Sequence, residues 1–168
     1  MTADLRRSPL AGRDFDFSGA RELPFLTMIN VRTTAPLLGV PLPAPNRVAI
    51  AGERAILWLG PDEYLVVGPP DDRIDVAGES VVDVSANRTT IELSGPHARD
   101  ILEKGMSIDL HPRSFGPGQC AQTLLARAQV VVRQVDRPFD TGPTYHVLVR
   151  GSFAPYLADW LVDAAKEF

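Results

Sequence analysis

The sequence predicts an α+β fold in which two helices of the C-terminal half pack on mostly antiparallel sheet. Three observations lead to this class. Short apolar runs rich in β-branched residues recur along the chain, and helical apolar spacing occurs only twice, both times late. In addition, 15 prolines and 13 glycines require many turns. Strands and helices in this order favour helices on one face of an antiparallel sheet.

Size and composition fit one globular domain. The chain has 168 residues, of which 45% are hydrophobic and 23% are charged. A net charge of −4 and a pI near 5.3 argue against a nucleic-acid-binding protein and against attachment to an anionic membrane. We find neither a signal peptide nor an apolar run of about 18 residues, the length of a membrane span. The single cysteine, Cys120, excludes an internal disulfide, and we expect a cytoplasmic protein.

The first 20 residues are predicted to form a flexible N-terminal arm, because they mix charges with few periodic apolar positions. Phe15 and Phe17 are spaced like one face of a strand, or like two anchors on another surface. Residues 21–168 are predicted to form a single α+β domain. It has a β-rich lobe at about 21–70 and an α/β lobe at about 81–168.

The β-rich lobe is predicted to be a meander of short strands. Four prolines between Pro36 and Pro45 exclude a helix there and indicate an extended surface loop. Gly60-Pro61-Asp62-Glu63 has the composition of a turn. The apolar runs between such breaks predict strands at 25–31, 48–50, 55–59 and 64–67.

The α/β lobe is predicted to follow the order β-β-α-β-β-α. Its first helix begins near Pro96, capped by Ser94 or Gly95, and ends at Gly105. Ser152 is predicted to cap the last helix, whose apolar residues share one face. Strands are expected at 81–84, 89–93 and 145–149, and residues 119–135 form one bent strand or a hairpin.

The sequence contains no complete catalytic or metal-binding motif. His97, His111 and His146 lack the spacing of a zinc pair, and we interpret them as ordinary imidazoles. Cys120 has no basic neighbour in the sequence to activate it, so we expect an inert thiol. The acidic pairs at 62–63 and 71–72 and the Gly116-Pro117-Gly118 segment are interpreted as turns.

Several segments resemble the gamma subunits of heterotetrameric sarcosine oxidase. The most specific are DLHPRSFGPGQCAQT at 109–123 and IELSGPHARDIL at 91–102. LGPDEYLVVGPP at 59–70 and SFAPYLADWLVDAA at 152–165 also contribute, and the resemblance covers most of residues 22–167. It implies a fold related to the folate-binding domain of aminomethyltransferases.

The resemblance also implies a function. The enzyme of this family oxidises sarcosine to glycine, forms peroxide and can pass the one-carbon unit to tetrahydrofolate. Its alpha and beta subunits hold FAD, FMN and NAD, and its delta subunit binds zinc. The gamma subunit carries no cofactor. We therefore expect no catalytic, cofactor-binding or metal-binding residue in this chain, and a role in assembly with the alpha, beta and delta subunits.

Subunit contacts are expected at aromatic, apolar and mixed polar positions outside the predicted strands. Prolines and leucines of the 36–45 loop lose little entropy on docking, because the loop is already extended. The candidates are Phe15, Phe17, Leu37, Leu38, Pro41, Leu42, His111, Arg113, Phe115 and Gln119. Two alternatives stay open: a free-standing folate-binding or one-carbon-transfer domain, and a small interaction module with an unrelated partner.

Overall fold

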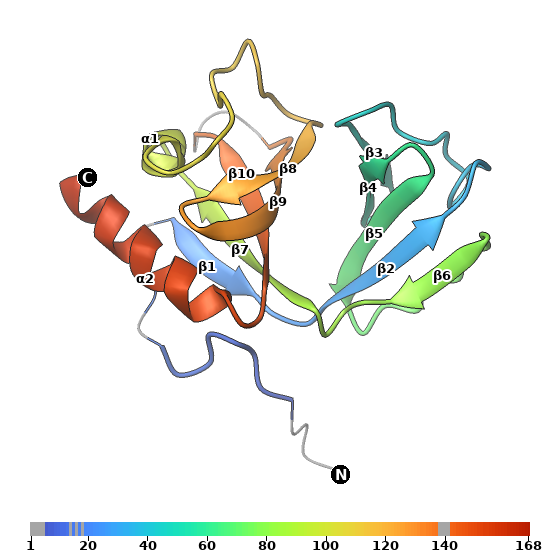
Figure 1. Cartoon of the computed structure of the whole chain (residues 1–168), viewed down its shortest axis with the longest axis horizontal. Coiled ribbons are helices and arrows are strands. Elements are labelled where there is room, and N and C mark those ends of the chain that lie inside the picture. Colours follow the sequence, from blue (N-terminus) through green and yellow to red (C-terminus); the bar gives the residue numbers. More distant parts are fainter. Residues whose placement is uncertain (1–5, 14, 16, 18, 138–141) are drawn as a thin grey trace.

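The computed structural model describes residues 6–13, 15, 17, 19–137 and 142–168 and contains two five-stranded antiparallel sheets side by side (Figure 1). Sheet A has the strand order β1-β7-β10-β9-β8, and sheet B has the order β3-β4-β5-β2-β6. Two helices follow late in the chain. The predicted α+β class is thus confirmed, while the kinship to aminomethyltransferases stays a prediction.

The strands lie close to the predicted apolar runs. Sheet A consists of β1 (Ala20–Leu23), β7 (Arg88–Ser94), β8 (Cys120–Leu125), β9 (Ala128–Val135) and β10 (Thr144–Arg150). Sheet B consists of β2 (Leu26–Arg32), β3 (Val48–Ala51), β4 (Arg54–Gly60), β5 (Glu63–Pro70) and β6 (Ser80–Asp83).

Two short strands cross between the lobes expected from the sequence. β1 lies before the β-rich lobe's other strands but pairs with β7 in sheet A. β6 falls at the start of the expected α/β lobe but pairs with β2 in sheet B. The edge strand β1 of sheet A and the edge strand β6 of sheet B therefore each come from the lobe expected to form the other sheet. The predicted division at residues 70–81 does not separate the two sheets.

The segment 119–135 is a hairpin. β8 and β9 pair from Cys120↔Arg133 to Leu125↔Ala128, and Ala126 at the turn has φ 51°. β9 then pairs with β10. The second half of the chain follows β-β-α-β-β-β-α, one strand more than the predicted order.

Both helices begin without the predicted side-chain caps. Helix α1 (Ala98–Glu103) has His97 at its N-cap position, and α2 (Ala154–Ala164) has Phe153 there. Neither N-cap side chain bonds the first turn, so the predicted caps at Ser94, Gly95 and Ser152 are wrong. Pro155 occupies the first turn of α2, where a missing N–H costs nothing. A short 3₁₀ turn, η2 (Ala165–Glu167), ends the chain's last helix.

Three apolar layers hold the molecule together. The helices pack on the side of sheet A that faces away from sheet B, where Leu102 and Leu157 meet Val147 (Figure 1). Between the sheets, Met28 and Leu57 of sheet B meet Val131 of sheet A. The outer side of sheet B is covered by the 36–45 loop and by Ile74 and Val76. Each sheet is thus buried on both faces over much of its area.

The described part of the N-terminal segment lies against the domain. Leu10 and Phe15 are buried in the core between sheet A and the helices. Arg13 pairs with Asp159 of α2 at 2.8 Å, and Ser8 donates a hydrogen bond to Glu22. Residues 6–13 therefore pack on the domain instead of extending from it, and the flexibility of residues 1–20 stays a prediction.

Gly105 provides a test of close packing after α1. A Cβ at this position would lie 2.5 Å from the ring of Trp160 and 3.2 Å from the amide nitrogen of Ala126. We expect Gly105→Ala to lower the free energy of unfolding by roughly 2 kcal/mol, since the added Cβ would displace the Trp160 ring or the backbone at Ala126. Denaturant titration measures this loss. Gly116→Ala, whose Cβ would meet its nearest atoms at 3.7 Å, is the control and should change stability little.

Candidate functional site

Three of the ten predicted contact residues are part of this chain's own core. Phe15, Leu37 and Phe115 are 6%, 1% and 4% exposed, respectively. Their side chains are unavailable to another subunit while the fold is intact. The other positions reach the surface to different degrees: Pro41, His111 and Arg113 are exposed, and Phe17, Leu38, Leu42 and Gln119 are half-buried.

The two loops that carry most of these residues lead to one junction between the sheets. Arg47 forms an isolated β-bridge with Gln119, and the Val48 amide donates to Gly118 O at 2.9 Å. The segment that follows the 36–45 loop therefore lies beside the end of the 109–119 loop, just before β8. Residues far apart in the sequence are brought together here, which sequence reasoning did not foresee.

The 109–119 loop is held by its own polar side chains. Asp109 accepts hydrogen bonds from Ser114 Oγ at 2.6 Å and from the His111 amide, and these bonds hold the pKa of Asp109 below its usual value. Gln119 Oε1 accepts a bond from the Gly116 amide. Gly118 has φ 75°, as expected for a turn glycine. Internal hydrogen bonds thus fix the conformation of the loop, and His111 and Arg113 are exposed on it.

A buried ion-pair cluster lies on the face of sheet A that turns toward sheet B. Glu92 is 3% exposed, and its carboxylate lies 2.8 Å from both Arg21 and Arg137 and 3.0 Å from His146 Nε2. Arg133 donates to His146 Nδ1 from Nη2 at 3.0 Å. The sequence signal was one ionisable residue within each of three apolar strands, but only the register brings these residues together.

This geometry fixes the protonation of His146. Nδ1 accepts from Arg133, so Nε2 carries the proton and donates to Glu92. Burial and the charge of Arg133 lower the pKa of His146 to about 4, against the opposing pull of Glu92. Burial by itself would raise the pKa of Glu92, but the hydrogen bonds from His146 and Arg21 and the charge of Arg137 hold it below its usual value. The cluster is therefore a neutral imidazole between fixed charges, with no group poised to exchange protons near neutral pH.

Cys120 occupies the same face and is 1% exposed. Burial raises the pKa of its thiol to about 11, and Sγ lies 3.3 Å from the carbonyl oxygen of Arg47. A thiolate, the reactive form, is disfavoured in such surroundings. We expect a thiol-specific reagent at pH 8 to leave native Cys120 unmodified over the time in which the urea-unfolded chain reacts fully. Rapid modification of the native protein, followed by mass spectrometry, would contradict this placement.

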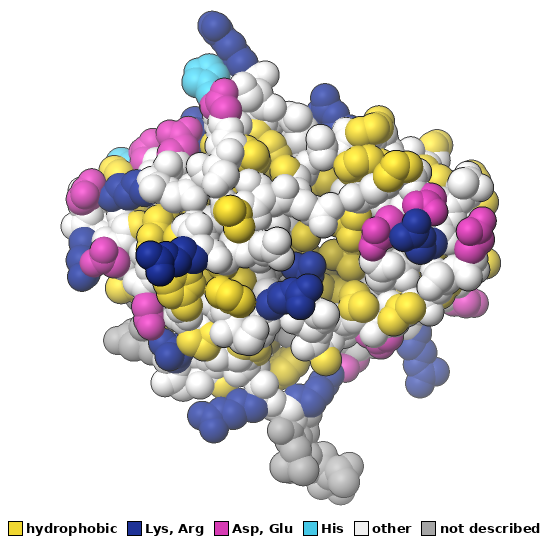
Figure 2. Space-filling model, viewed as in Figure 1, with side chains coloured by type: hydrophobic (Ala, Val, Ile, Leu, Met, Phe, Trp, Pro, Cys, Tyr) yellow, Lys and Arg dark blue, Asp and Glu magenta, His cyan; other side chains and the backbone are white. Residues whose placement is uncertain are grey.

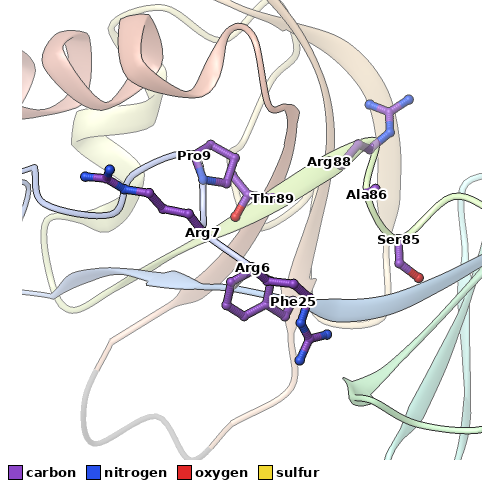
Figure 3. A pocket seen from close by; sticks show the side chains of 8 residues that line it. All are labelled: Arg6, Arg7, Pro9, Phe25, Ser85, Ala86, Arg88 and Thr89. Carbon is purple, nitrogen blue, oxygen red and sulfur yellow. The ribbon is translucent and has the colours of Figure 1, made fainter. Parts of the chain in front are cut away.

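One hollow of about 330 Å³ lies where the N-terminal segment crosses the start of β7. Arg6, Arg7 and Arg88 line it together with Phe25, Ser85 and Thr89. Figure 3 shows that the three guanidinium groups point in different directions. Arg6 is in addition paired with Asp71 at 2.7 Å and stacks on Phe25. The three arginines therefore do not converge on a ligand in this hollow.

Within residues 6–13, 15, 17, 19–137 and 142–168, no three side chains of the types that ligate metals come together. Among the same residues, no helix has the length and apolar character needed to cross a membrane. The interpretation of His97 and His111 as ordinary imidazoles stays a prediction. His97 stacks on Phe168, and His111 accepts a backbone hydrogen bond within its own loop.

Comparison with known proteins identifies the family. The model of the sarcosine oxidase gamma subunit family matches residues 29–167. The chain belongs to this family. A sarcosine oxidase subunit gamma from an Arthrobacter species is 36% identical over 99% of this chain and 93% of its own length. A subunit gamma from Corynebacterium sp. (strain P-1) is also 36% identical, over 88% of this chain and 80% of its own length.

One chain of a solved structure shares the fold of this chain over nearly its whole length. It is heterotetrameric sarcosine oxidase from Corynebacterium sp. U-96 in complex with pyrrole 2-carboxylate. One of its chains matches with a TM-score of 0.81 and 31% identity, covering 98% of this chain and 96% of that chain. The resemblance predicted from the segments at 91–102 and 109–123 is therefore confirmed.

Proposed function

We propose that this chain is a non-catalytic gamma subunit that supports the assembly of a heterotetrameric sarcosine oxidase with alpha, beta and delta subunits. The observation that carries the proposal is the end-to-end correspondence with a chain of such an oxidase, which covers 98% of this chain and 96% of the other. A domain corresponding over its whole length to one subunit is suited to that subunit's place in the complex.

The chemistry of the described residues supports a structural role. The buried groups that a reaction might use are each held in an inactive form: Cys120 as a thiol, His146 as a neutral imidazole and Glu92 as a paired carboxylate. In the proposal, the flavins, NAD and zinc belong to the other subunits, and the complex works in the cytoplasm. This chain contributes a rigid two-sheet body.

The proposed contact surface includes the exposed parts of the two loops that meet at the Arg47–Gln119 bridge. Leu38 and Leu42 cover the outer side of sheet B and stay half-buried, so a partner could bury them further. Pro41, His111 and Arg113 add an exposed rim of apolar, aromatic and cationic groups. Such a mixture of apolar centre and polar rim is typical of protein interfaces.

Co-expression of this chain with alpha, beta and delta subunits tests the proposal. We expect an affinity tag on this chain to recover all four subunits in equal amounts, with sarcosine-dependent peroxide formation in the recovered complex. Omission of this chain should lower the yield or stability of the complex without changing the flavins it holds. A stable and fully active oxidase formed without this chain would contradict the assembly role.

The isolated chain separates this role from a folate-binding one. We expect a colourless protein whose calorimetric titration with tetrahydrofolate shows no saturable heat. Tight and saturable binding would favour a free-standing folate-binding domain.

A further inference from the structure

Positive charge is concentrated on the face of sheet A that turns toward sheet B. By strand alternation this face carries Arg21, Arg88, Arg133 and Arg150, with Glu92 as its one acid among the described strand residues. The whole chain is acidic, with a net charge of −4. Figure 2 shows basic side chains at the junction between the two sheets on the viewed face. The charge of this face is therefore positive, whereas the net charge of the whole chain is negative.

Arg88 and Arg150 are directly opposite each other on β7 and β10. Like charges in such a cross-strand position repel and destabilise a sheet. The contacts of the described residues include no carboxylate beside either guanidinium, whereas Arg21 and Arg137 on the same side are paired with Glu92. Burial and the charge of Arg150 together lower the pKa of Arg88. The pair is thus a local excess of positive charge that the fold itself leaves unbalanced.

A groove beside Arg88 is open to an anion. A groove of about 360 Å³ beside Arg88 is lined by polar side chains of the β8–β9 hairpin, among them Gln122, Thr123 and Gln129. Leu124, which is 42% exposed, adds an apolar wall. Figure 3 shows the Arg88 guanidinium directed away from Arg6 and Arg7.

We propose that Arg88 and Arg150 form a carboxylate-binding site that an aspartate or glutamate side chain of a partner subunit fills when the oxidase assembles. This inference rests on the proposed function. Arginine suits the role because its planar guanidinium binds a carboxylate through two parallel hydrogen bonds and stays charged when partly buried. A protein carboxylate fits the open groove with its apolar wall, since a partner surface would cover Leu124 at the same time.

The binding of this chain to the other three subunits tests the site. We expect Arg88→Gln and Arg150→Gln each to raise the dissociation constant at least about tenfold, because the partner carboxylate loses one of its two cations. The double variant should lose less than the product of the two effects, since both arginines share one carboxylate. Raising the salt concentration should weaken the wild-type complex more than either variant complex.

Two controls make the outcome specific. Arg73→Gln removes the same charge at an exposed position elsewhere on the chain and should change the dissociation constant less than twofold. The melting temperature of free Arg88→Gln should equal or exceed that of the wild type, because a like-charge contact is removed. Wild-type assembly with unchanged affinity in both single variants would overturn this site and leave the proposed function standing. Failure of the wild type itself to assemble would overturn both.

The isolated chain distinguishes a partner carboxylate from a free one. Calorimetric titration with succinate, a free dicarboxylate, should give no saturable binding in the millimolar range. Saturable binding that Arg88→Gln abolishes would show that the site takes a small anion without a partner, and it would overturn the proposal.

Discussion

Replacing Glu92 by glutamine is expected to lower the free energy of unfolding by about 3 kcal/mol, one of the largest losses that a single substitution can cause in this chain. The carboxylate is 3% exposed and serves Arg21, Arg137 and His146 at once. Glutamine keeps the shape but removes the charge, so Arg137 loses its counter-charge and Arg133 loses the nearest acid on its face. Loss of this charge is costly mainly because it leaves the buried Arg133 guanidinium without a compensating carboxylate.

Chemical denaturation at pH 7 measures this loss. Glu103→Gln makes the same change at an exposed position of α1 and should shift stability by less than about 0.5 kcal/mol. If Glu92→Gln costs as little as Glu103→Gln, the cluster contributes no net stability and the contacts around Glu92 are incidental. The carboxyl's pKa lies below its usual value, so its contribution is present above pH 4.5 and is lost as the pH falls through the folded-state pKa.

The apolar patterns of the sequence identified most of the elements but not the way in which they join. Runs such as 55–59 and 145–149 are mostly apolar, and burial on both faces follows from that composition. β1, with the sequence AREL, lacks such a pattern; β6 was predicted as a strand at 81–84, but all four of its residues are exposed and do not indicate which sheet it joins. Their positions are set by backbone pairing with β7 and β2, which leaves no periodic trace in side chains.

The helix starts were mispredicted for a related reason. Ser94 and Ser152 have the residue type of an N-cap, but Ser94 is the last residue of β7, and its hydroxyl and amide bond Gly19 O. Because Ser94 takes part in strand pairing, it does not cap the helix that follows. Serine is a common N-cap residue, but here tertiary pairing with Gly19 places Ser94 in a strand instead.

For the buried cluster around Glu92, strand alternation predicts the direction of each side chain but not which strands are neighbours. Alternation places Glu92 opposite in direction to Ile91 and Leu93, and His146 opposite to Tyr145 and Val147. It does not say that these strands are neighbours, nor that Glu92 pairs with His146 in register. Phe115 and Leu37 show the same limit: they belong to loops in the sequence and to the core in space.

Acid is expected to destabilise the protein well above the pH at which carboxylates are usually protonated. Burial and the charge of Arg133 lower the pKa of His146 to about 4, compared with 6.5 for a free imidazole. Between these values the unfolded chain binds a proton that the folded chain does not. Stability therefore rises with pH from about 4 to 6.5, and the full difference is about 3 kcal/mol.

His146→Gln isolates this contribution, because a glutamine amide can donate to Glu92 and accept from Arg133 without titrating. The free energy of unfolding is measured by denaturant titration at intervals from pH 4.5 to 8. We expect the wild-type curve to fall steeply below pH 6.5 and the variant curve to fall less, while the two run parallel between pH 7 and 8. Parallel curves over the whole range would mean that His146 is protonated in the native state. The hydrogen bond from Arg133 to Nδ1 forbids that state, since it would place two donors against each other.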